Sequence, residues 1–103
     1  MLLTITQQAK EQLDQIKNGY YLQLWYDTKG LGCGVNGMPT FRFVDEKESF
    51  HQDVDCETYP AIIASQQQTF FSQKVKLDFI NGMFRLSSPE GILNPFISVS
   101  SIV

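Results

Sequence analysis

The stretch VKLDFINGMFRL, residues 75–86, says most about the fold of this chain. Apolar residues alternate at Val75, Leu77 and Phe79, which is the period of a half-buried strand. Asn81-Gly82 follows, and this pair suits a two-residue hairpin turn because both residues tolerate a positive φ. The stretch therefore predicts an antiparallel hairpin in which one strand ends near Ile80 and the next begins at Met83.

Similar patterns extend toward the N-terminus. Residues 20–27 alternate as a strand, and residues 40–44 form a second apolar run that returns from the glycine-rich segment 29–37. These features predict another hairpin, with the glycine-rich segment at its tip. Residues 57–64 predict a further strand, in which Pro60 marks either a strand start or an edge position.

One helix is expected before these strands. Thr6 is a suitable N-cap, and Ala9, Leu13 and Ile16 follow at the spacing of a narrow apolar helical stripe. Asn18-Gly19 then ends the helix. With a short opening strand at 3–5, the sequence predicts a single domain over residues 1–103, of the α+β class and predominantly β.

Composition and charge exclude several kinds of partner. The chain has 103 residues, 43% of them apolar, and a net charge of −3. Its eight basic residues are scattered, whereas a nucleic-acid partner requires clustered Lys and Arg. There is no signal-peptide pattern and no apolar run of about 20 residues. We therefore expect a cytoplasmic protein with no nucleic-acid or membrane partner.

Cys33 is the candidate functional residue. It lies between Gly32 and Gly34, so that its thiol is sterically accessible and the backbone can approach a ligand closely. Exposed N–H groups in such a loop favour a thiolate. The alternative is that the glycines only serve a long hairpin tip and that Cys33 has no function.

Two other residues carry weaker signals. Cys56 is interpreted as a small buried hydrophobe, because a disulfide with Cys33 is not expected in a reducing compartment. His51, the only histidine, lies in a polar stretch and is interpreted as an exposed loop residue rather than a metal ligand. No C-x-x-C pair supports a zinc site.

The order of these features resembles the HesB/IscA-like family of iron–sulfur biogenesis proteins over nearly the whole chain. The matching features are the N-terminal helix, the glycine-rich loop with its cysteine, and the apolar strand segments downstream. The residues that carry the resemblance are Ile5-Thr6, Leu22-x-Leu24, Cys33, Phe41-x-Phe43-Val44-Asp45-Glu46, Ala61-Ile62-Ile63, Phe70-Phe71, Leu77-Asp78-Phe79, Gly82-x-Phe84 and Ser88-Pro89. The resemblance implies a small barrel-like β sandwich of mixed strands.

The resemblance also implies a ligand set that this chain retains only in part. Family members bind iron or an iron–sulfur cluster, usually across subunits, through a loop cysteine and a C-terminal C-G-C motif. Cys33 matches the first position, whereas the other two fall at about Pro95 and Ile97, neither of which can ligate iron. The apolar residues of the tail are therefore expected to pack on the core or on a second subunit; they are Ile92, Leu93, Phe96, Ile97 and Val99.

Three functional hypotheses follow. The first is a divergent iron–sulfur biogenesis or iron-handling protein that is not an enzyme. It would hold iron or a cluster weakly at Cys33, act as a homodimer, and serve apo iron–sulfur target proteins. The second is a protein-interaction module that keeps the scaffold without metal. The third, a thiol enzyme with Cys33 as nucleophile, lacks a visible base.

Overall fold

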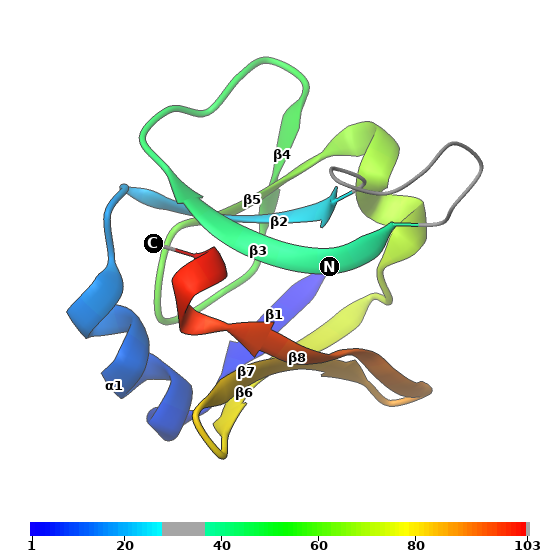
Figure 1. Ribbon diagram of the computed structural model, residues 1–103. Coiled ribbons are helices and arrows are strands. Elements are labelled where there is room, and N and C mark those ends of the chain that lie inside the picture. The colour runs from blue at the N-terminus through cyan, green and yellow to red at the C-terminus, as the bar shows by residue number, and fades with distance from the viewer. Residues whose placement is uncertain (28–36, 103) are drawn as a thin grey trace.

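The computed structural model describes residues 1–27 and 37–102, which form eight strands, one α-helix and two short 3-10 turns. Figure 1 shows the helix at one side of a strand-rich body, as expected for a predominantly β member of the α+β class. The elements are β1 (Leu2–Ile5), α1 (Gln7–Ile16), β2 (Tyr21–Asp27), β3 (Met38–Val44), β4 (His51–Val54), β5 (Ala61–Ala64), η1 (Ser65–Phe70), β6 (Lys74–Ile80), β7 (Met83–Ser88), β8 (Gly91–Ser98) and η2 (Val99–Ser101).

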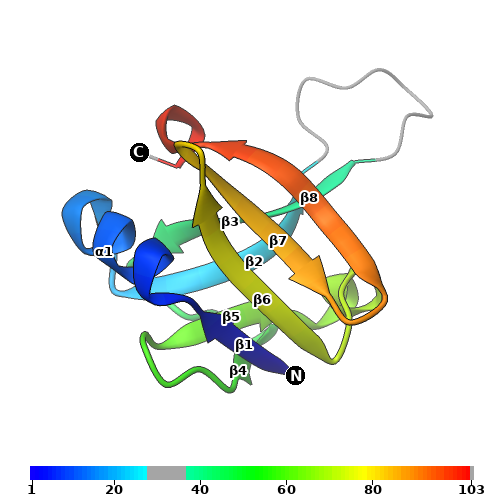
Figure 2. The same cartoon turned by 90° about the horizontal axis from the view of Figure 1, so that it is seen from below.

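The strands form two four-stranded sheets. Sheet A has the order β1-β6-β7-β8, and sheet B has the order β3-β2-β5-β4. The β1–β6 and β2–β5 pairs are parallel, whereas the remaining pairs are antiparallel. The predicted mixture of strand directions is therefore confirmed, and the two sheets face each other across the core (Figure 2).

Two seams join the sheets into a barrel-like body. At the β1–β4 seam the backbone closes directly, because Leu3 N donates to Asp55 O at 2.8 Å and Asp55 N donates to Met1 O at 3.0 Å. At the β3–β8 seam the two strands lie close together (Figure 1), and a side chain makes the link. Asn94 Nδ2 donates to the Pro39 carbonyl at 2.8 Å. The second seam is thus joined less tightly than the first.

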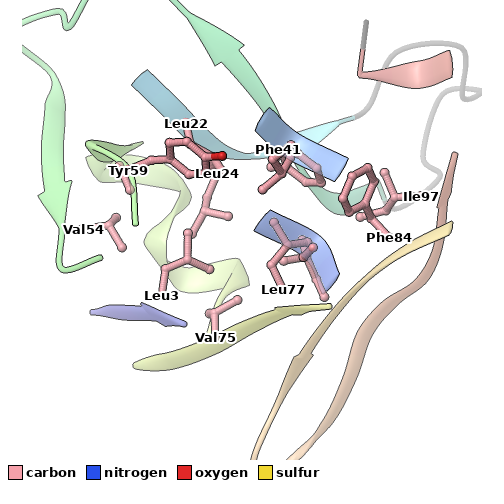
Figure 3. Close-up of a cluster of buried hydrophobic side chains, with 14 of the residues drawn as sticks. Leu3, Leu22, Leu24, Phe41, Val54, Tyr59, Val75, Leu77, Phe84 and Ile97 are labelled. Atoms are coloured by element: carbon pink, nitrogen blue, oxygen red, sulfur yellow. The ribbon is translucent and has the colours of Figure 1, made fainter. Parts of the chain in front are cut away.

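The core lies between the sheets and is built by residues that alternate along the strands. Leu22 and Leu24 of β2 face inward with Phe41 of β3, while Leu77 and Phe84 contribute from sheet A. Figure 3 shows these side chains converging from both layers. All five are at most 1% exposed, so that apolar burial drives the association of the sheets.

Local signals for the second hairpin and the helix are confirmed. Asn81 and Gly82 have φ values of 53° and 80°, as a two-residue turn with positive φ at both positions requires. The helix buries Ala9 and Leu13 and begins after Thr6, whose Oγ1 accepts a hydrogen bond from Ala9 N at 3.3 Å. The Thr6 hydroxyl also donates to Asp78 Oδ1 at 2.8 Å, which ties the helix start to β6.

We expect Thr6→Ala to lower the free energy of unfolding by about 1–2 kcal/mol, because it removes both the cap and the bond to Asp78. Thr6→Ser keeps a hydroxyl at the same place and should lose less than about 0.5 kcal/mol. Urea unfolding of the three proteins measures both values. Equal losses in the two variants would show that the hydroxyl is not what matters at this position.

Two expectations about the middle of the chain are corrected. Residues 57–60 are not part of a strand, and β5 begins only at Ala61, after Pro60, in the interior of sheet B. The segment around His51, interpreted as a loop, forms the strand β4. Its alternation is obscured in the sequence because only Val54 of this strand is buried.

Asp14 connects the helix to the β4–β5 connection. Tyr59 Oη donates to Asp14 Oδ1, and Lys10 Nζ lies 2.8 Å from Asp14 Oδ2. The hydrogen bond from Lys10, followed by the one from Tyr59, lowers the pKa of Asp14 from its ordinary value of 3.8. The pKa of Tyr59 is raised, first by burial and then by its bond to Asp14.

Folded Asp14 therefore binds its proton less tightly than in the unfolded chain. The ionised carboxylate stabilises the fold above about pH 4, and this contribution is lost as the pH falls through the lower folded-state pKa. We expect the melting temperature of Asp14→Asn to lie below that of the wild type at pH 7 and to approach it near pH 2. Asp53→Asn, which removes the exposed Lys47–Asp53 pair, is the control and should show a smaller difference at pH 7.

Candidate functional site

Cys33 lies outside the described residues, which end at Asp27 before it and resume at Gly37 after it. The segment 28–36 connects the ends of β2 and β3, where Asp27 is paired with Met38. The predicted first hairpin is confirmed by this antiparallel pairing. Any site that includes Cys33 is therefore connected to the ends of these two strands.

The two residues at which the resemblance predicts the C-terminal ligand positions, Pro95 and Ile97, lie on β8. Ile97 is 3% exposed, is paired with Phe84 across the β7–β8 ladder, and lies beside the Phe84 ring in Figure 3. Pro95 is half-buried. Because neither side chain carries a donor atom for a metal, this part of β8 serves packing.

The expectation that the tail packs is confirmed for three of its five apolar residues. Ile97 joins the core, and Leu93 and Val99 pack against it. Ile92 and Phe96 do not pack in the single chain, because they are 56% and 70% exposed. The side chains of β8 thus divide between the core and the outer surface.

A cavity of about 580 Å³ lies along the β3–β8 seam, and we call it the seam cavity. Its lining includes the end of β2 and the start of β3, which are paired in the first hairpin, and part of β8. The residues that show this are Asp27, Met38, Asn94, Phe96 and Ile97. The end of β2 and the start of β3, on either side of segment 28–36, therefore lie at the same cavity as β8.

The wall of the seam cavity also carries a cationic and aromatic pair. The guanidinium carbon of Arg42 lies 4.1 Å from the centroid of the Trp25 ring, which is a cation–π geometry. Trp25 Nε1 is buried and has no hydrogen-bond partner among the residues described. The cavity thus combines apolar surface with a positive charge and an unmatched donor.

Comparison with known proteins places this chain in a family. A family model described as iron-sulphur cluster biosynthesis matches residues 1–101. The chain is also 31% identical over 104 residues to the uncharacterized protein YqkB of Bacillus subtilis (strain 168), with 96% of this chain and 97% of YqkB covered. The chain belongs to the iron–sulphur cluster biosynthesis family.

Solved structures share the fold of this family member. A Lactobacillus acidophilus protein assigned to Fe–S biosynthesis matches with a TM-score of 0.75 and 19% identity, over 95% of this chain and 87% of that one. IscA, crystallised with a [2Fe-2S] cluster, matches with a TM-score of 0.63 and 12% identity, over 92% and 98% of the two chains. At these identities the likeness establishes the HesB/IscA-type fold alone.

The described residues do not themselves form a metal centre in this family member. No group of three or more His, Cys, Asp or Glu side chains is close enough to hold a metal within residues 1–27 and 37–102. Cys56 is a free, half-buried thiol that packs against the core, next to Asp55 of the β1–β4 seam. It is not among the residues that line the seam cavity.

In the same ranges, no helix is long and apolar enough to cross a membrane.

His51 is half-buried in β4 rather than exposed in a loop, which corrects its interpretation. Glu48 N donates to its Nδ1 at 2.9 Å, and its Nε2 lies 3.1 Å from Nε2 of Gln23. Both ring nitrogens are therefore engaged by protein groups. Gln23 was not singled out from the sequence, although a glutamine between Leu22 and Leu24 was a visible polar interruption of a buried strand.

We expect Ile97→Ala to lower the free energy of unfolding by about 2–5 kcal/mol, because it opens a cavity beside Phe84. Ile92→Ala is the matched control on the same strand and should change it by less than about 0.5 kcal/mol, since Ile92 is largely exposed. Urea unfolding measures both. Similar values for the two variants would contradict the division of β8 into a core face and an outer face.

Proposed function

We propose that this protein binds and transfers iron or an iron–sulfur cluster, and that Cys33 is its own ligand to this cargo. The observation that carries the proposal is membership of the iron–sulphur cluster biosynthesis family over residues 1–101. The fold shared with IscA, which has been crystallised with a [2Fe-2S] cluster, supports the same cargo. Cys33 stands at the position of the family's loop cysteine.

The number of ligands determines how the cargo would be held. A thiolate cluster normally requires four ligands. One cysteine from each of two chains supplies half of them, because Pro95 and Ile97 have no donor atoms. A homodimer that shares the cluster would therefore need external ligands such as a small thiol. Few protein ligands imply weak, exchangeable binding, which suits delivery to apo target proteins.

The seam cavity is the place where we expect the iron or cluster to be held. Asp27 and Met38, at the ends of the segment that contains Cys33, line the cavity together with Phe96. Met38 and Phe96 are exposed apolar side chains, and such residues offer a contact surface to a second chain or a target. We expect the cargo to be held near this cavity.

A role as carrier rather than catalyst fits the described side chains better than a thiol enzyme. A nucleophilic cysteine requires a nearby base. His51 is the only histidine, and both of its nitrogens already contact Gln23 and Glu48. The described residues therefore offer no free imidazole to activate Cys33.

Anaerobic reconstitution with iron and sulfide tests the proposal. We expect the wild type to take up about one cluster or less per two chains. The visible absorption per chain should decrease on dilution, because binding requires two chains. Iron, sulfide and the ultraviolet–visible spectrum are the measurements. Cys33→Ser should abolish uptake.

Cys56→Ser is the matched control, since Cys56 packs against the core, and it should leave uptake nearly unchanged. Uptake that survives Cys33→Ser would place the site elsewhere. A wild type that takes up no iron under strictly anaerobic conditions would contradict the proposal and favour the protein-interaction module.

A further inference from the structure

The outer face of sheet A, on the side away from the core, is positively charged. Lys74 and Lys76 alternate with buried residues along β6, and Arg85 does the same on β7. These three cations share one face, because alternate residues of a strand point to the same side. Figure 2 looks onto this face, and no helix or second sheet lies in front of it. The face is thus an open cationic surface on a chain whose net charge is −3.

Arg85, in the middle of this face, has no ionic partner. It is half-buried, and its Nε is buried without a hydrogen-bond partner among the described residues. The ion pairs found in residues 1–27 and 37–102 do not include it. A partly buried charge without a counter-ion is unfavourable.

The acidic residue nearest to Arg85 along the ladder is engaged elsewhere. Asp78 of β6 is paired directly with Arg85 of β7, which is the position of a cross-strand ion pair. Asp78 Oδ1 instead accepts hydrogen bonds from Thr6 Oγ1 and from Phe79 N, each at 2.8 Å. The start of the helix therefore holds the carboxylate that would otherwise neutralise Arg85.

Exposed apolar side chains surround the unpaired arginine. Ile80 and Met83, which are paired at the hairpin end of β6 and β7, are both exposed. On the other neighbour, β8, the bulge opposite Arg85 contains Phe96, which is also exposed. Arginine, methionine and aromatic residues are the types that protein-binding surfaces favour. The composition of this face is therefore that of an interaction surface.

A groove of about 440 Å³ continues the cationic surface toward β1. Lys74 and Lys76 line it from β6, Leu2 and Thr4 contribute from β1, and residues 87–89 contribute from the end of β7 and the turn after it. Among the described residues, no acidic side chain lines this groove. The groove and Arg85 thus lie side by side on the same strands.

We propose that the outer face of sheet A, with Arg85 at its centre, is a docking surface for a protein segment that carries both carboxylates and apolar side chains. A carboxylate of the segment supplies the counter-ion that Arg85 lacks, and the planar guanidinium suits its two oxygens. Other carboxylates pair with the lysines of the groove, while the apolar side chains cover Met83 and Phe96. Cys33 is not part of this surface, and the inference does not depend on iron binding.

Other anionic partners fit this surface less well. Basic segments that recognise anionic lipids carry about four to eight Lys and Arg residues, whereas this face presents three. A large polyanion is also repelled by the net negative charge of the chain. A small anion pairs with Arg85 but leaves the apolar side chains uncovered. An acidic protein segment uses both features of the face.

Titration of the whole protein with an acidic peptide tests the inference. The probe is the acetylated and amidated peptide Glu-Phe-Glu-Glu-Phe-Glu, and the measurement is NMR. We expect saturable shifts of the Arg85 Nε–H signal and of the backbone amides of Lys76 and Phe96. A peptide with glutamine for glutamate, or with alanine for phenylalanine, should bind at least about ten-fold more weakly, because it loses charge-assisted bonds or buried apolar area.

Two further probes represent the other anions, which are vesicles that contain phosphatidylserine and inorganic phosphate. Sedimentation with the vesicles without any binding of the peptide would assign the face to a membrane and overturn the inference. Phosphate that binds as tightly as the peptide would reduce the surface to a simple anion site. The absence of shifts at Arg85 with the peptide would overturn the inference as well.

Variants separate binding from folding. Arg85→Gln should weaken peptide binding at least about ten-fold. Its melting temperature should equal or exceed that of the wild type, because the substitution removes a charge that has no partner in the free protein. Lys47→Gln removes the same charge from the β3–β4 connection and is the control, which should bind the peptide as the wild type does. A folded Arg85→Gln protein with wild-type affinity would contradict the inference.

A second variant tests the same surface without touching a buried group. Lys76 is exposed, so that Lys76→Gln is expected to fold normally. It should weaken peptide binding about two- to five-fold, which is the effect of one exposed ion pair. Unchanged affinity in this variant would remove the groove from the docking surface.

Discussion

The contact of Phe41 with Phe84 joins the two halves of this protein. Their rings meet edge to face, with centroids 5.2 Å apart and planes at 86°, and both side chains are at most 1% exposed. Phe41 belongs to the first hairpin and Phe84 to the second, so that this contact holds sheet B against sheet A. Phe41 also lines the seam cavity, so that this packing contributes to the cavity wall.

The same packing includes the part of β8 where the resemblance predicts metal ligands. Ile97 lies against Phe84, and its side chain, which is larger than that of a cysteine, adds buried apolar surface to the core. A cysteine there would be smaller and would leave part of that surface unfilled. This chain therefore has packing where the resemblance predicts a metal ligand, and Cys33 remains the predicted ligand for the proposed cargo.

The outer face of sheet B shows a different constraint. The β3–β4 connection has to travel from one edge of the sheet to the other, since the strand order is β3-β2-β5-β4. Glu48 of this connection donates its backbone N–H to His51. Gln23 is buried and hydrogen-bonded to Arg42 and His51, although it lies on the side of the sheet opposite the core. A groove with donors from the strands and carboxylates from the connection is the result.

Local sequence determined the elements whose signals lie within a few residues. The Asn81-Gly82 turn, the Thr6 cap and the alternation from Val75 to Phe79 were predictable, because turn geometry, capping and period are properties of neighbouring residues. The resemblance to a family extended this to the overall fold and to Cys33 as a candidate ligand, which remains a prediction. Tertiary structure alone decided that β5 lies inside a sheet, that His51 is on a strand, and that Gln23 is buried with Arg42 and His51 as its hydrogen-bond partners. These features arise from parallel pairing and from a connection that crosses the sheet, in which the interacting residues are distant in sequence and leave no local pattern.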